Sequence, residues 1–196
     1  SDIAVKAAYS YIKKQIDSAD RSWDVSQSLA MALFHANEEV NKKALTNDNY
    51  SGMGSTLVEL FISEGKAYFC HVGDSRAYLL RDGIHRLTKD QTLGDYLVEQ
   101  KKTPTEQIPT WKWHALTQAI GGGDELVPEM VHLELKTSDT LLMCSDGLTD
   151  MLSDAEIANI IQKSSSDINK AANMLIQEAN DKGGKDNISV ILVSYP

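Results

Sequence analysis

The sequence has few of the residues that mark unusual classes of protein. Two cysteines and four prolines occur among 196 residues, and the twelve glycines follow no repeat. These counts exclude a disulfide scaffold, a collagen and a low-complexity linker. No hydrophobic run approaches the ~18 residues of a membrane span, and residues 1–15 lack the apolar core of a signal peptide.

Positive charge is also scarce. The chain has 19 Lys and Arg against 28 Asp and Glu, which gives a net charge of −9. No run of basic residues is longer than a pair of lysines. A partner such as nucleic acid or an anionic membrane surface is therefore disfavoured. The two cysteines, Cys70 and Cys144, lie in apolar runs of strand character. We expect both to be buried free thiols, which suits a cytoplasmic location.

What the sequence does contain is a mixture of helical and strand patterns, in a chain long enough for one domain with its own core. Ser1 is placed to cap the first helix and Ser153 opens a capping box. Helices are predicted at 3–16, 25–40, 153–162 and 168–179. Strands are predicted at 56–63, 66–72, 76–80, 84–87, 130–135, 140–144 and 188–193. Because the strands do not alternate regularly with helices, this order indicates an α+β fold.

Three aspartates lie where predicted strands begin or end. Asp74 follows one strand, Asp146 follows the strand that ends at Cys144, and Asp186 precedes the last strand. If the last two strands are antiparallel neighbours, Asp146 and Asp186 project from the same rim of the sheet. Clustered carboxylates repel one another unless a cation compensates, and oxygen ligands suit magnesium or manganese.

A purely structural interpretation of these aspartates stays open. Asp-Gly and Asp-Asn are common turn dipeptides, and Asp beside Gly is usually a turn former. The residue pattern by itself does not decide between turns and a metal site.

Six segments, taken together and in this order, resemble the metal-dependent protein phosphatase family (PPM, the type 2C-like Ser/Thr phosphatases). The resemblance extends from about residue 1 to residue 195, and the compact loops are similar to those of bacterial members. The matching segments are 52–56, 71–78, 87–90, 116–121, 139–150 and 184–188.

The resemblance implies a fold and a reaction. The fold is a four-layer αββα arrangement, in which two antiparallel sheets pack as a sandwich with helices on both outer faces. The reaction is hydrolysis of phosphoserine or phosphothreonine in a protein substrate, by attack of a water that bridges two magnesium or manganese ions. A cognate Ser/Thr kinase is implied as a partner. Residues 91–115 would form a flap beside the active site, within a single domain over 1–196.

The resemblance also implies roles for individual residues. Asp146 and Asp186 are similar to ligands of one core metal ion, and Asp74 to the partner of Asp146 at a third, weaker site. Asn187 is expected to support the turn, not to bind metal. Gln91 stands where many members have His.

The family's opening section, with an Arg, an early acidic residue and an Asp-Gly-x-Gly-Gly segment, has no counterpart in these residues. Because the chain starts at Ser1 without Met, we expect an N-terminally truncated domain that lacks its first strands. The key catalytic residues are then expected upstream of Ser1, and the 196 residues alone should have little or no activity.

Two functions follow from this pattern. The first is a phosphatase of which this chain is a truncated form. The alternative is a non-catalytic pseudophosphatase or regulatory module on the same fold. Missing strands would leave unpaired sheet backbone, so we also expect compensation, such as strand exchange or a dimer formed through the exposed sheet.

Overall fold

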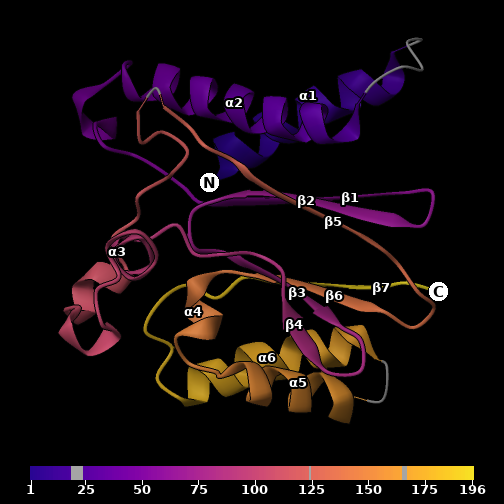
Figure 1. Cartoon of the computed structure of the whole chain (residues 1–196). Coiled ribbons are helices and arrows are strands. Elements are labelled where there is room, and N and C mark those ends of the chain that lie inside the picture. The colour runs from indigo at the N-terminus through magenta and orange to yellow at the C-terminus, as the bar shows by residue number, and fades with distance from the viewer. Residues whose placement is uncertain (19–23, 124, 165–166) are drawn as a thin grey trace. The chain divides into compact units, whose positions relative to one another are not determined.

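The computed structural model describes residues 1–18, 24–123, 125–164 and 167–196. These residues contain six α-helices and seven strands (Figure 1). They form two compact units. Unit 1 comprises residues 1–74 and 90–133, and unit 2 comprises residues 75–89 and 134–196. The single domain expected over 1–196 stays a prediction.

Unit 1 contains a three-stranded sheet in the order β1-β2-β5. Strands β1 and β2 form an antiparallel hairpin in which Leu57 lies opposite Val72. Helices α1 and α2 pack together over one face of this sheet (Figure 1). The bounds are α1 Asp2–Asp17, α2 Val25–Ala44, β1 Leu57–Ser63, β2 Lys66–Val72 and β5 Glu129–Glu134.

Small side chains let the two helices of unit 1 approach closely. Buried alanines come from both helices and are joined in one core by Leu29, Leu33 and Val40 of α2. Alanine also has the highest helix propensity, so the same residues favour helix and interface. The core alanines are Ala4, Ala7, Ala8, Ala32 and Ala36.

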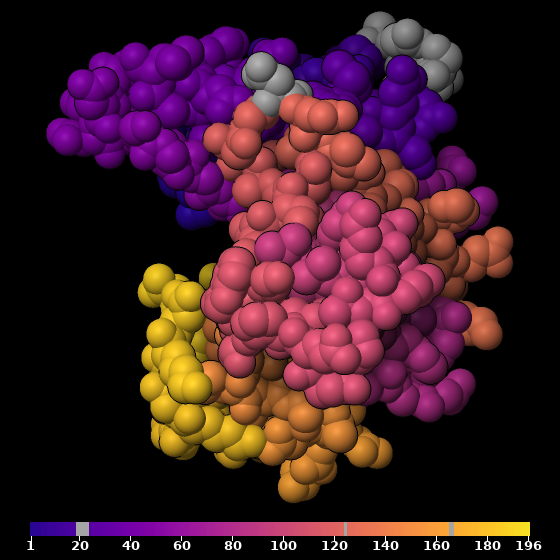
Figure 2. All heavy atoms as spheres, turned by 60° about the vertical axis from the view of Figure 1, so that its left-hand side comes forward, coloured from indigo at the N-terminus to yellow at the C-terminus, as the bar shows by residue number. Residues whose placement is uncertain are grey.

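The segment 91–115 of unit 1 is a continuous stretch of surface in the space-filling view (Figure 2). It contains α3, Leu93–Lys101, followed by single 3-10 turns at Thr105–Gln107 and Thr110–Trp113. A Cβ placed on Gly94 would lie 2.6 Å from the ring of Trp113, so the indole packs directly on the α3 backbone. Trp111, by contrast, is 62% exposed.

Unit 2 contains a four-stranded antiparallel sheet in the order β4-β3-β6-β7. Helices α5 and α6 cover one of its faces, with Ile157, Leu175 and Leu142 in a shared core (Figure 1). The strands are β3 Arg76–Leu80, β4 Ile84–Arg86, β6 Thr140–Cys144 and β7 Val190–Ser194. The helices are α4 Asp146–Thr149, α5 Asp154–Lys163 and α6 Ile168–Asp181.

The predicted α+β class with two antiparallel sheets is confirmed, and every predicted helix and strand is present within a few residues. The capping box at Ser153 forms with Glu156. Cys70 and Cys144 are buried free thiols, and burial raises the pKa of the Cys70 thiol to about 12. None of the described helices is both long and apolar enough to cross a bilayer.

Two details differ from the sequence-based expectation. Ser1 occupies the N-cap position of α1, but its side chain makes no capping hydrogen bond; its carbonyl instead accepts from the Val5 amide at 3.0 Å. The short helix α4 between Asp146 and Thr149 was not expected. Four residues are too few to show a helical period, and Gly147 has low helix propensity.

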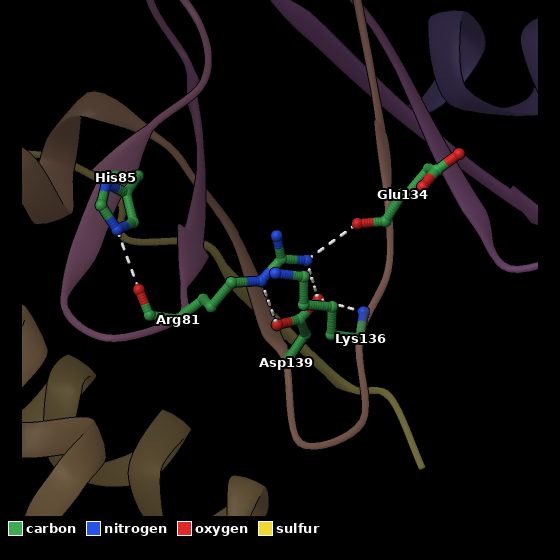
Figure 3. Close-up of polar contacts among 5 residues, drawn as sticks. All are labelled: Arg81, His85, Glu134, Lys136 and Asp139. Atoms are coloured by element: carbon green, nitrogen blue, oxygen red, sulfur yellow. Dashed lines mark hydrogen bonds and ion pairs between the residues drawn. The ribbon is translucent and has the colours of Figure 1, made fainter.

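A polar cluster lies at the end of the unit 2 sheet where β3 ends and β6 begins (Figure 3). Arg81 donates from Nε and Nη2 to the two carboxylate oxygens of Asp139, at 2.8 and 2.5 Å. Nη2 also donates to the Glu134 carbonyl at 2.8 Å, and the Lys136 amide donates to Asp139 at 2.7 Å. Asp139 is 1% exposed, and its Arg81 contact holds its pKa below the usual value.

We therefore expect Asp139→Ala to destabilise the protein by about 1–3 kcal/mol, because the Lys136 amide and the Arg81 guanidinium lose their acceptor. Urea denaturation followed by circular dichroism measures the loss. Asp82→Asn at the neighbouring exposed turn is the control for removing one negative charge from the same end of the sheet, because Asn tolerates the left-handed backbone (φ 53°) of this position. Equal stabilities of the two variants would contradict this account of Asp139.

Candidate metal site at the rim of the unit 2 sheet

The pairing of β6 with β7 brings two predicted metal ligands to the same edge. The strands are antiparallel, and Cys144 at the end of β6 lies opposite Val190 at the start of β7. Asp146 follows β6 by two residues, and Asp186 precedes β7 by four. Asp146, the first residue of α4, and Asp186, on the loop before β7, therefore lie at one rim of the sheet, as the strand order predicted.

Ser145 fastens the two loops to each other. Its amide donates to the Ser189 carbonyl at 3.1 Å. Its hydroxyl donates to the Asn187 carbonyl at 3.1 Å and accepts from the Ser189 amide at 3.0 Å. These three hydrogen bonds join residues 42 to 44 positions apart in the sequence, so they hold Asp146 and Asp186 on adjoining backbone.

Gly147 allows the loops to touch. A Cβ at this position would lie 2.4 Å from the Asn187 carbonyl oxygen and 3.4 Å from the Asp186 carbonyl carbon. The neighbour is backbone and not a flexible side chain, so any larger residue would push the loops apart. The glycine of the Asp146-Gly147 pair is thus required by the contact between the loops.

Each aspartate is oriented by the amide that follows it. Asp146 Oδ1 accepts from the Gly147 amide at 2.8 Å, and Asp186 Oδ1 accepts from the Asn187 amide at 2.6 Å. Asn187 contributes its backbone amide and carbonyl to this turn. The donors are carboxylate oxygens, the type of ligand that a hard divalent ion such as magnesium or manganese prefers.

Asp150 is a third carboxylate at this rim, one that sequence reasoning missed. One of its oxygens lies within 4.8 Å of a carboxylate oxygen of Asp146. The Asp150 amide donates to the Asp146 carbonyl at 2.8 Å, as expected four residues along a helical turn. The i, i+4 spacing of the two aspartates is the signal that could have revealed it, had α4 been predicted.

Asp74 lies in unit 1, on the turn directly after β2. Gly73 before it has φ +103°, and a Cβ there would lie 2.3 Å from Thr56 Cγ2. Glycine is needed at this turn for both reasons. The expected pairing of Asp74 with Asp146 at a metal stays a prediction.

Strand β3 next to the rim carries a buried tyrosine. Arg76 lies opposite Cys144, and its Nη1 donates to the Tyr78 hydroxyl at 3.4 Å. Tyr78 donates to Asp154 Oδ1 at 3.0 Å. Burial raises the pKa of Tyr78 far above its usual range, so the phenol stays protonated and the hydrogen bond to Asp154 persists.

The chain is similar to known proteins over nearly its whole length. The family described as "Protein phosphatase 2C" matches residues 1–186. Protein phosphatase PhpP of Streptococcus pneumoniae is 37% identical over 188 residues, which cover 94% of this chain and 74% of that protein.

Solved structures agree with this similarity. Serine/threonine phosphatase Stp1 from Staphylococcus aureus superimposes with a TM-score of 0.84 at 28% identity, over 99% of this chain and 78% of Stp1. The catalytic domain of serine threonine protein phosphatase PstP, solved in complex with two manganese ions, gives a TM-score of 0.80 at 28% identity. That match covers 98% of this chain and 80% of the PstP chain.

Proposed function

The chain belongs to the protein phosphatase 2C family, and from this premise we propose that it removes phosphate from phosphoserine and phosphothreonine in proteins, using bound magnesium or manganese. The observation that carries the proposal is the rim of the unit 2 sheet, where Gly147, next to Asp146, lies against the backbone of Asp186 and Asn187. The homologues are Ser/Thr protein phosphatases. A Ser/Thr kinase that supplies the phosphoprotein belongs to the same proposal.

In this proposal Asp146 and Asp186 hold one ion, with Asp150 near enough to Asp146 to support it. Asp74 contributes to a further, weaker site. When bound, the ions supply a water activated for in-line attack on phosphorus and neutralise the phosphate oxygens. Hydrogen bonds from the backbone amides of Gly147 and Asn187 orient the carboxylates of Asp146 and Asp186 without an ion. Little movement of these carboxylates is therefore needed when an ion binds.

These 196 residues contain no Asp-Gly-x-Gly-Gly segment, and we propose that their turnover is slow for that reason. The competing hypothesis of a non-catalytic module makes a different prediction, namely no turnover at any metal concentration.

A metal titration tests the proposal. With a phosphothreonine peptide as substrate, phosphate release should rise with added Mn²⁺ and saturate, and EDTA should lower it by ~10²-fold or more, since several kcal/mol of charge stabilisation are lost. The unphosphorylated peptide is the blank. Turnover that is indifferent to EDTA would contradict metal-dependent hydrolysis, and metal binding without turnover would favour the regulatory module.

A further inference from the structure

The turn that presents Asp74 depends on one peptide unit, that of Gly73. Its φ of +103° is open only to glycine, and Thr56 packs against the space where a side chain would stand. Because Asp74 is the next residue, the direction of its side chain follows from how the Gly73 peptide is held.

Gln91 binds both polar groups of Gly73. Its side-chain Oε1 accepts from the Gly73 amide at 2.8 Å. Its own backbone amide donates to the Gly73 carbonyl at 3.1 Å. The backbone donor and acceptor of Gly73 are thus satisfied by a single residue that is 18 positions away in the sequence.

Two further hydrogen bonds hold the side-chain amide and the backbone carbonyl of Gln91 in place. Nε2 donates to the Val127 carbonyl at 3.1 Å, and the Gln91 carbonyl accepts from the Thr117 amide at 2.8 Å. Gln91 as a whole is 8% exposed. Since Gly73 offers a donor and Val127 an acceptor, only one orientation of the amide satisfies both. The side-chain amide therefore bridges the segment before β5, at Val127, to the turn that carries Asp74.

We propose that Gln91 is a positioning residue for Asp74, and that it sets the affinity of the metal ion that Asp74 holds. This rests on the proposed function, in which Asp74 is a metal ligand. Groups that orient a metal ligand typically change metal affinity by 10–100-fold when removed. Gln91 acts on the ligand through the Gly73 peptide and makes no contact with metal in this scheme.

The same unit offers a matched control in Asn37. This buried amide also accepts from a glycine with positive φ, since Oδ1 binds the Gly121 amide at 2.7 Å. Its Nδ2 donates to the Gly123 carbonyl at 3.0 Å. It is 6% exposed. Asn37 thus has the chemistry and burial of Gln91 but supports a different loop.

The experiment measures Mn²⁺ binding directly, from the electron paramagnetic resonance signal of free Mn²⁺, on the full 196-residue chain. Gln91→Leu and Asn37→Leu should both lower the unfolding midpoint. Only Gln91→Leu should weaken the weakest Mn²⁺ site, by ~10-fold or more. Gln91→Asn, one methylene too short to span Gly73 and Val127, should shift the same site by a smaller factor and serves if the Leu variant does not fold.

Asp74→Asn distinguishes a failure of the Gln91 positioning role from a failure of the assignment of Asp74 as a metal ligand. If it weakens the same Mn²⁺ site and Gln91→Leu adds nothing in that background, the positioning role is supported. If Asp74→Asn weakens the site and neither Gln91 variant does, the positioning role is wrong while the proposed function stands. If Asp74→Asn leaves all Mn²⁺ binding unchanged, the metal assignment of Asp74 fails and the inference fails with it. Equal shifts for Gln91→Leu and Asn37→Leu would also overturn it.

Discussion

Replacing Asp146 by Asn should lower the proposed manganese-dependent hydrolysis of a phosphothreonine peptide by ~10²–10³-fold, or down to the blank. Asn has the shape of Asp and retains an oxygen that can accept from the Gly147 amide, so the turn after β6 should persist. What is lost is a negative charge at the rim where Asp150 lies near Asp146 and the backbone of the Asp186 loop lies against Gly147. Loss of one anionic ligand removes several kcal/mol of metal-derived stabilisation, which corresponds to that change in rate.

The control for Asp146→Asn is Asp82→Asn. It removes the same charge from the exposed turn between β3 and β4, at the end of the sheet opposite the rim. Both variants should unfold at the same denaturant concentration as the parent chain within error. Mn²⁺ binding should weaken only in Asp146→Asn. Retention of turnover and Mn²⁺ affinity by Asp146→Asn would rule out the rim as the catalytic metal site.

Glu59→Gln should stabilise the protein increasingly as the pH rises. Glu59 lies opposite Cys70 in the β1–β2 hairpin, on the strand face where Leu57 and Phe61 pack against the α1–α2 core. Its Oε2 is buried and has no hydrogen-bond partner among the described residues. Burial raises the pKa of Glu59 from 4.5 to about 8.

The sign of the effect follows from the two pKa values. The folded state keeps the Glu59 proton up to about pH 8, whereas the unfolded chain releases it near 4.5. The native chain therefore loses stability as the pH rises between these values, by an amount on the order of a few kcal/mol. Gln cannot ionise, so the variant should match the parent near pH 4 and exceed it by ~2–4 kcal/mol at pH 8.5.

Urea denaturation at pH 4.5, 6.5 and 8.5 checks this prediction. Glu64→Gln, the same substitution at the exposed turn of the same hairpin, is the control and should leave the pH dependence unchanged. A constant difference between Glu59→Gln and the parent at all three pH values would mean that the carboxyl is not held protonated in the core.

Much of the fold was predictable because its determinants are local. The capping box of Ser153 and Glu156 and the β-branched runs of β6 and β7 are visible in a few consecutive residues. The joint position of Asp146 and Asp186 followed once β6 and β7 were assumed to be antiparallel neighbours. In each case a short-range pattern sufficed, with one topological assumption added.

The parts that escaped prediction depend on distant partners. Nothing near Gln91 in the sequence shows that its side chain will bind Gly73 and Val127. Asp150 joins the rim only because α4 forms, and a four-residue helix leaves no period to detect. Glu59 shares its strand face with Leu57 and Phe61, so alternation along β1 could have flagged a buried acid.

The contact between Gly147 and Asn187 has a consequence for the segment that lies between them. Helices α4, α5 and α6 occupy the chain from one loop to the other, so this helical layer is a closed loop whose ends meet at the rim. An ion held by Asp146 and Asp186 would cross-link the two ends of that loop. A cross-link lowers the conformational entropy of the unfolded chain more than that of the folded chain, and this effect grows with loop length. Metal binding at the rim would thus stabilise helices α5 and α6 against unfolding, although neither helix supplies a ligand.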